Sequence, residues 1–263
     1  MAWFRCVLLV AGLVSMLAAA PVHAGRSCET RPLTAQTLEA GLGLAGLTLQ
    51  ALEASGERVV VLARAGQDLS KHGLRYSHLG FAWRNDAGEW RVVHKLNQCG
   101  TADAGVYRQG LGEFFLDDLW RYEAAWAVPA REVQDRLVAL LRDPARVAAL
   151  HQRRYSIVSY AWGQKYQQSN QWAIETLAAA MDPQVTTREQ AQAWLRQKGY
   201  EPTQLRLRTL TRLGGRVSAA NVAFDDHPDR QRFAGRIETV TVDSVFQWLQ
   251  RSGLAGAPVS LQP

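Results

Sequence analysis

A four-residue turn between two apolar stretches constrains this chain more than any other feature. Residues 85–88 read Asn-Asp-Ala-Gly, where Asn suits the first position of a type I turn and Gly suits a left-handed position. The flanking residues are rich in β-branched and aromatic side chains, so the pattern predicts a β-hairpin over 75–96. The favoured loop has three residues, 86–88, with a bulge at Gly88 and a pair formed by Asn85 and Glu89.

The register of this hairpin decides where its two histidines lie. In the three-residue register, Gly80 faces His94, and His78 faces Leu96. His78 and His94 then lie on one face of the hairpin as diagonal neighbours, roughly 7–8 Å apart at the backbone. A two-residue or four-residue loop would shift the pairing by one and place the histidines on opposite faces. The register is therefore a testable part of the prediction.

The first 24 residues have the pattern of a secretory signal peptide. Arg5 supplies the positive region, Val7–Ala20 is apolar, and Val22-His23-Ala24 is a small-x-small cleavage signal. The apolar run is too short for a membrane anchor, and Gly25 rather than cysteine follows the predicted cut, which argues against a lipoprotein. The sequence therefore predicts a mature chain without a membrane span that is periplasmic or secreted after cleavage near Ala24.

The predicted mature chain has 263 − 24 = 239 residues, enough for one large domain. Its formal net charge is +6 − 1 = +5, because Arg5 leaves with the signal. Arginines cluster modestly at 206–216, but the chain has no nucleic-acid-binding motif or aromatic platform, so we expect no nucleic-acid partner. A basic surface suits an anionic cell-envelope polymer or a periplasmic protein as the partner. The sequence does not indicate an oligomeric state.

Two cysteines remain after the predicted cleavage. An even pair in an oxidising compartment most often forms a disulfide, so we expect Cys28 to be bonded to Cys99. This bond would tie the N-terminal arm to the segment after the hairpin. The alternative is that Cys99 is a free nucleophile five residues beyond His94.

Helical and strand patterns alternate along the chain without regular βαβ repetition. This mixture predicts an α+β fold with an antiparallel sheet packed against helices. We expect a single domain over 25–263, with a C-terminal elaboration from about residue 200. The predicted helices are 33–55, 130–141, 144–152, 169–181, 187–198 and 244–251 (with Asp243 as N-cap); the predicted strands outside the hairpin are 58–64, 123–128, 204–211 and 237–242; the predicted loops include 98–112 and 214–233.

A second short stretch, Gln167–Glu175, complements the hairpin. Its Ser169 stands where a helix should begin, and serine is a favoured N-cap in any protein. The functional interpretation is that a nucleophile at a helix N-terminus gains from the positive end of the helix dipole and from nearby free amides. Both interpretations fit the sequence.

Residues 76–81, Tyr-Ser-His-Leu-Gly-Phe, resemble the histidine strand of circularly permuted papain-like proteins. These are the NlpC-type cell-wall peptidase relatives and the lecithin retinol acyltransferase group. In them the histidine strand comes first, a polar third member lies on the next strand, and a cysteine opens a later helix. His94 resembles the third member, and residues 168–172, Gln-Ser-Asn-Gln-Trp, resemble the box around the cysteine, with Ser169 in the cysteine's place.

The resemblance implies a permuted papain-like core with Ser169 as nucleophile, His78 as general base and His94 as its orienting partner. Because a serine hydroxyl ionises far less readily than a thiol, His78 would have to accept its proton directly. Two functions follow: a serine-variant amidase, peptidase or acyl hydrolase acting on cell-envelope material, or an inactive relative that binds an envelope ligand or protein in the same cleft. Neither requires a cofactor.

Over its mature length the chain also resembles DUF2145, a bacterial family of exported proteins of unknown function. Residues 224–228 (Phe-Asp-Asp-His-Pro) and 239–246 (Thr-Val-Thr-Val-Asp-Ser-Val-Phe) are similar to that family. The family has no established activity, so this resemblance assigns none.

Two further groups are candidate ligand contacts. Near the serine box, aromatic and amide side chains would contact a substrate; these are Trp162, Tyr166, Asn170 and Trp172. The cluster Asp225, Asp226 and His227 has the chemistry of a metal site if a further ligand such as His72 joins it. The alternative for this cluster is a plain turn, because Asp-Asp-His-Pro has strong turn chemistry, and we expect no metal.

Overall fold

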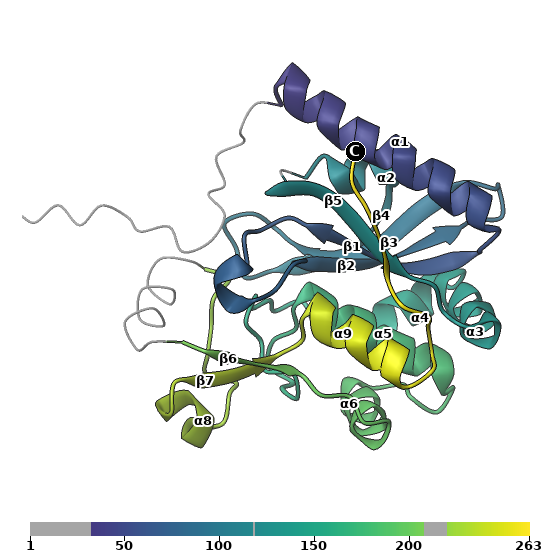
Figure 1. The fold of residues 1–263 in the computed structure, drawn as a ribbon. Coiled ribbons are helices and arrows are strands. Elements are labelled where there is room, and N and C mark those ends of the chain that lie inside the picture. Colours follow the sequence, from purple (N-terminus) through teal and green to yellow (C-terminus); the bar gives the residue numbers. More distant parts are fainter. Residues whose placement is uncertain (1–32, 118, 208–219) are drawn as a thin grey trace, which may run out of the picture.

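The structure is a computed structural model that describes residues 33–117, 119–207 and 220–263. The predicted signal peptide lies outside the described residues. The largest element of the structure is a six-stranded antiparallel sheet with the strand order β4-β3-β2-β1-β5-β8 (Figure 1). The strands are β1 (Val59–Ala65), β2 (His78–Arg84), β3 (Trp90–Asn97), β4 (Ala104–Gly110), β5 (Arg121–Ala127) and β8 (Val259–Leu261).

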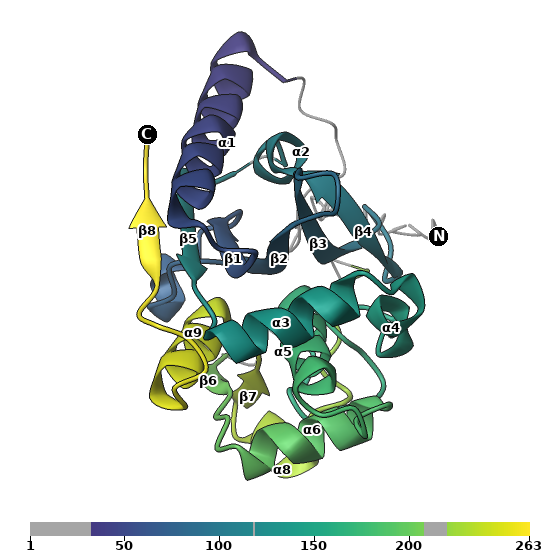
Figure 2. The same ribbon diagram turned by 90° about the vertical axis from the view of Figure 1, so that its right-hand side faces the viewer.

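Helices cover both faces of this sheet (Figure 2). One face packs against α1 (Ala35–Ser55) and α2 (Leu111–Phe115); the other packs against α3 (Arg131–Leu141), α5 (Ser169–Met181) and α9 (Val242–Arg251). The remaining elements are η1 (Ser70–His72), α4 (Pro144–Ala149), α6 (Arg188–Gln197), α8 (Asp229–Phe233) and a two-stranded sheet of β6 (Thr203–Arg206) and β7 (Arg236–Thr239). In the part of the chain that the structure describes, no helix combines the length and apolarity needed to cross a membrane.

Side chains alternate between two buried cores on the two faces of the sheet. Odd-numbered residues of the central strands, such as Phe81 and Val93, pack toward α5, whereas even-numbered residues, such as Ala82 and Val92, pack toward α1 and α2. All seven residues of β1 are buried. A strand that is buried on both faces has a continuous run of apolar residues. The predicted strand 58–64 therefore agrees with β1 to within one residue at each end.

The predicted hairpin register is confirmed. Arg84 pairs with Trp90, the Asn85 N–H donates to the Glu89 carbonyl at 2.9 Å, and Gly88 has φ 81°. The β2–β3 pairing runs from this turn only as far as Phe81 and Val93. The two histidines lie just beyond the last of these backbone pairs.

The α+β class is confirmed, but several boundaries were wrong. The predicted loop 98–112 contains β4 and the start of α2, and the predicted loop 214–233 contains α8. Because β4 is an edge strand with mostly exposed or half-buried residues, its sequence lacks the apolar alternation that marks a strand. Helix α9 begins earlier than predicted: Thr241, rather than Asp243, is its N-cap, and it forms a capping box with Ser244.

Candidate functional site

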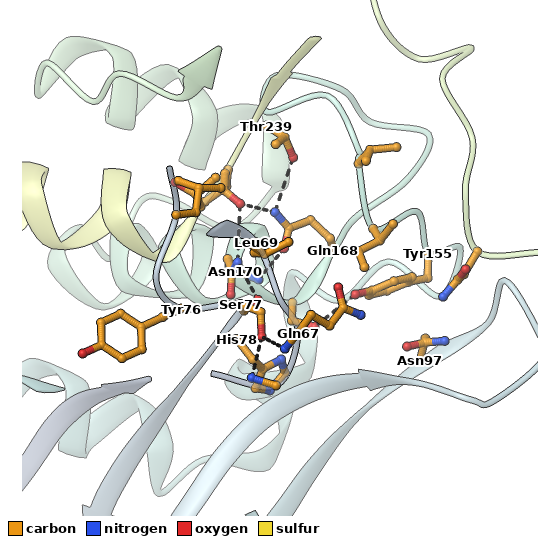
Figure 3. Close-up of a pocket in the computed structure, with 18 of the residues that line it drawn as sticks. Gln67, Leu69, Tyr76, Ser77, His78, Asn97, Tyr155, Gln168, Asn170 and Thr239 are labelled. Carbon is orange, nitrogen blue, oxygen red and sulfur yellow. Dashed lines mark hydrogen bonds between the residues drawn. The ribbon is translucent and has the colours of Figure 1, made fainter. Parts of the chain in front are cut away.

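A cavity of about 700 Å³ opens where β1 ends, β2 begins and β3 ends (Figure 3). One wall is the segment 66–78, which includes η1, and the opposite wall comes from residues 96–101 and 155–158. The start of α5 closes one side, and β6 and β7 contribute apolar side chains. His78, Ser169 and Asn170 all line this cavity, so three of the residues predicted from sequence share one space.

The start of α5 is held by its own side chains. Gln168, not Ser169, is the N-cap: its side-chain oxygen accepts from the Asn170 N–H at 2.8 Å. Gln168 also donates to the carbonyl of Val240. Ser169 is therefore the first helical residue, with 4% of its surface exposed, and its hydroxyl is not used to cap the helix. The capping interpretation of Ser169 is wrong.

Asn170 fastens α5 to the histidine strand. Its Oδ1 accepts from the Leu79 N–H at 2.9 Å, and its Nδ2 donates to the Ser77 carbonyl at 3.3 Å. Both partners are neighbours of His78 in the chain. Leu79 lies two residues beyond the last β2–β3 pair, so its N–H is used by the Asn170 side chain. Ser169 therefore directly precedes, in the chain, the residue that binds the backbone on both sides of His78.

The two histidines are in direct contact. His78 Nε2 lies 2.9 Å from His94 Nδ1, and His94 Nε2 lies 2.7 Å from Oε1 of Gln109 on β4. Gly80 makes room for this arrangement, because a Cβ at position 80 would lie 3.0 Å from the His94 Cβ and 2.8 Å from Val92 Cγ1. We call the chain of contacts from His78 through His94 to Gln109 the histidine relay.

His94 is fully buried. Burial lowers its pKa to about 4, and the nearby Arg64 guanidinium acts in the same direction, against the smaller raising effects of Gln109 and Asp117. Phe114 lies against both rings, with centroid distances of 5.9 Å to His78 and 5.2 Å to His94. At neutral pH His94 is therefore an uncharged imidazole packed against the apolar ring of Phe114.

Ser169 Oγ lies 3.5 Å from Oη of Tyr155, a residue of the cavity wall. Tyr155 is 6% exposed, and burial raises the pKa of its phenol above the ordinary value, although hydrogen bonds with the Ser169 backbone and hydroxyl oppose the change. The phenol consequently stays protonated at neutral pH and can donate a hydrogen bond at the start of α5.

Ser169 and His78 approach the cavity from different sides of the sheet. His78 is on the even-numbered face of β2, where its ring meets Phe114 of α2, whereas α5 packs on the odd-numbered face. Both side chains nevertheless border the same cavity, which lies at the end of the β2–β3 pairing. In the described residues, the connection between them runs through the cavity and through Asn170.

A buried polar network supports the segment before α5. Lys95 is fully buried, and its Nζ donates to Gln167 Oε1 at 2.7 Å and to the Gln152 carbonyl. Gln167 Nε2 donates to Glu175 Oε2 at 2.6 Å, and Arg188 Nε donates to the same carboxylate oxygen at 2.8 Å. Burial lowers the pKa of Lys95 to about 6, and Arg188 adds to the effect. This network fixes the residues that lead into Gln168 and Ser169.

Three of the four predicted substrate contacts do not line the cavity. Trp172 is fully buried and packs on Phe81 in the core, since the fourth residue of α5 faces the sheet. Trp162 packs between Tyr200 and Arg196, and Tyr166 lies beside Lys165. Of the four, only Asn170 contributes to the cavity wall, and it does so as a structural link.

The Asp225–His227 cluster is a turn in the structure. The Asp225 carboxylate pairs with Lys165, Asp226 Oδ2 accepts from the Tyr160 N–H at 2.8 Å, and His227 Nε2 lies 2.7 Å from the Val158 carbonyl. Throughout residues 33–117, 119–207 and 220–263, no group of three or more His, Cys, Asp or Glu side chains could hold a metal ion. The metal hypothesis has no support here.

Cys99 lies at the rim of the cavity and is disulfide-bonded, which argues against the alternative that its thiol is a nucleophile. Cys28 lies outside the described residues, so the pairing of Cys28 with Cys99 stays a prediction.

Sequence reasoning missed Gln109, Tyr155 and Lys95. Gln109 could have been found by continuing the hairpin register across one more strand, had β4 been recognised. Tyr155 and Lys95 reach the site through long-range contacts, and no local pattern marks them.

A family model described as "Uncharacterized protein conserved in bacteria (DUF2145)" matches residues 51–249, which is three quarters of the chain. The match covers the hairpin, the cavity walls and α5; most of α1 precedes it and β8 follows it. Comparisons with curated proteins and with solved structures gave no significant match.

Proposed function

The chain belongs to DUF2145, an uncharacterised bacterial family, and on that premise we propose that it is an exported hydrolase or acyltransferase of amide or ester bonds in cell-envelope material. Ser169 is the proposed nucleophile, His78 the general base and His94 its orienting partner. The observation that carries the proposal is that one cavity is lined by Ser169 at a helix start and by the first member of the histidine relay. The chain order of histidine strand, second histidine and helix-borne nucleophile supports a papain-like origin for this cavity.

The proposed chemistry uses Ser169, His78 and Tyr155, which all line the cavity. Ser169 Oγ forms a bond to the carbonyl carbon of the substrate while its proton passes to the imidazole of His78. The carbonyl π electrons move to oxygen, which the Ser169 backbone N–H and the Tyr155 hydroxyl would stabilise as the oxyanion. The carbonyl then re-forms and expels the amine or alcohol, which takes the proton from His78. Water or another acceptor completes the cycle by the same steps.

His94 contributes orientation and limited charge stabilisation in this scheme. A neutral imidazole accepts a hydrogen bond from His78 but carries no negative charge, so it stabilises the His78 imidazolium less than a carboxylate would. Because His78 would be only a modest base for the Ser169 hydroxyl, we expect slow turnover.

The test is covalent labelling of the mature chain with a fluorophosphonate probe, with the modified residue identified by mass spectrometry. We expect Ser169 to be labelled and the labelling rate to fall at least about 100-fold in His78→Ala. His72→Ala is the matched control, because His72 lies at the cavity rim outside the histidine relay. Labelling of Ser169 that persists in His78→Ala would rule out His78 as the base.

A catalytically inactive binding module is the second candidate. It is favoured by the position of Ser169 Oγ, whose described hydrogen-bond partner is Tyr155 Oη rather than a histidine. This candidate predicts no labelling of the wild-type chain, together with retention on immobilised peptidoglycan that Ser169→Ala leaves unchanged. Labelling of Ser169 by the probe rejects it.

A further inference from the structure

A small lobe lies at the end of the molecule opposite α1 (Figures 1 and 2). It consists of the antiparallel pair β6 and β7 together with α8, which ends three residues before β7 begins. Leu205 and Ile237, both at odd-numbered positions of the two strands, line the cavity. Because side chains alternate along a strand, the even-numbered residues face away from the cavity. The outer face of the small lobe therefore takes no part in the chemistry proposed for Ser169.

Two arginines lie directly opposite each other on this outer face. Arg206 of β6 is the register partner of Arg236 of β7, and both residues are exposed. Like charges in directly opposed positions destabilise a strand pair. Among the described residues, neither guanidinium has an ion-pair partner, and Glu238 on the same face accepts instead from Gln204 at 3.1 Å and from Gln231 at 2.9 Å. The described part of the chain thus supplies no carboxylate that offsets this repulsion.

A large aromatic ring is exposed on the neighbouring helix α8. Phe233 keeps 77% of its surface accessible, more than any other large apolar side chain in the part of the chain that the structure describes. Arg230 is also exposed and lies three positions earlier, so the two side chains are neighbours on the helix surface. The guanidinium of Arg232, which pairs with Asp229, lies with Cζ 5.3 Å from the centroid of the Phe233 ring. Folding therefore leaves this ring in water beside cationic groups.

We propose that the small lobe docks the mature chain on an anionic lipid bilayer, with Phe233 in the headgroup region and the exposed arginines against lipid phosphates. Cationic side chains next to an apolar ring suit such a surface, because the guanidinium binds phosphate while the ring leaves water. A soluble polyanion would neutralise the arginines but would not cover the ring. The proposal is independent of the catalysis proposed for Ser169.

The experiment is co-sedimentation of the mature chain with vesicles of phosphatidylglycerol and phosphatidylcholine in equal amounts, at about 0.1 M salt. Vesicles of phosphatidylcholine alone are the neutral reference. We expect binding to the anionic vesicles only. The double variant Arg206→Gln and Arg236→Gln should weaken binding about 30-fold, since each basic residue near such a surface contributes about fivefold. Phe233→Ser should weaken it about 10-fold, because the ring no longer leaves water on binding.

The matched controls make the same changes away from the small lobe. The double variant Arg91→Gln and Arg142→Gln removes the same charge from two exposed arginines that pair with Glu89 and Asp86. Val259→Ser removes an exposed apolar side chain on β8. Both controls should bind within about twofold of the wild-type chain, because charges more than a Debye length from the bilayer are screened.

Four results overturn the proposal. The first is no binding of the wild-type chain to the anionic vesicles, and the second is equal binding to the neutral ones. The third is binding that is weakened by the arginine variant but not by Phe233→Ser, which favours a soluble anionic polymer as the partner. The fourth is an equal loss in the control variants, or no loss in the variants of the small lobe, which places the contact elsewhere. None of these measurements uses the fluorophosphonate probe, so failure of the proposed catalysis leaves this test intact.

Discussion

Replacing the buried Lys95 by methionine should change how the stability of the protein depends on pH. The unfolded chain holds a proton on Lys95 up to its ordinary pKa of about 10.5, whereas the folded chain releases it above about 6. Between these values the unfolded state binds one more proton, so the free energy of unfolding rises with pH by about 1.4 kcal/mol per unit. From pH 7 to pH 9 this amounts to about 3 kcal/mol.

The assay is urea unfolding followed by tryptophan fluorescence at pH 7, 8 and 9, for the wild-type chain and for Lys95→Met. We expect the stability difference between the two proteins to shift in favour of the wild type by about 3 kcal/mol over this range. Other titrating groups are common to both chains and cancel in the difference. Lys71→Met, at an exposed lysine, should show no such shift. A difference that stays constant with pH would mean that Lys95 keeps its proton in the fold, and would refute the neutral-amine account of the network around Gln167.

Three further predictions concern stability measured by the same assay. Because the pKa of His94 is lowered to about 4 in the fold, stability should fall as the pH drops from 6.5 to 4, and His94→Gln should lose this dependence; an equal slope in both chains would contradict it. Trp172→Ala should cost about 3–5 kcal/mol, since the ring is fully buried; a cost below 1 kcal/mol would place it outside the core. Gly80→Ala should lower the free energy of unfolding by about 1–3 kcal/mol, because the new Cβ would crowd His94. An unchanged stability would show that β2 and β3 can move apart enough to admit a methyl group.

The parts of the fold that could be predicted from sequence are those fixed by local chemistry. The Asn85–Gly88 turn sets the register of two strands by itself, and helix α5 spans the predicted 169–181 because Asp182-Pro183 ends it. Thr187 and Gly199 likewise bound α6 as expected.

The candidate site was less predictable because its geometry depends on tertiary contacts. The sequence places Ser169 at a helix start, but only the contact of Gln168 with Val240 explains why Ser169 is not the cap. Nothing local indicates that His78 and α5 lie on opposite faces of the sheet, since the face that α5 covers is decided by tertiary packing. Trp172 was predicted to contact a substrate because residues 168–172 resemble the papain-like cysteine box. In the structure its position on α5 faces the sheet, so the side chain lies in the core.

The anchoring of Leu79 by Asn170 joins positions that are 91 residues apart, and this separation has a consequence for the order of assembly. The histidine hairpin closes through neighbouring residues and can form early, but α5 cannot dock until two thirds of the chain is available. A nascent or truncated polypeptide would therefore carry the paired imidazoles without the start of α5 docked near them. Any reactivity of this protein should switch on late, as a property of the finished molecule.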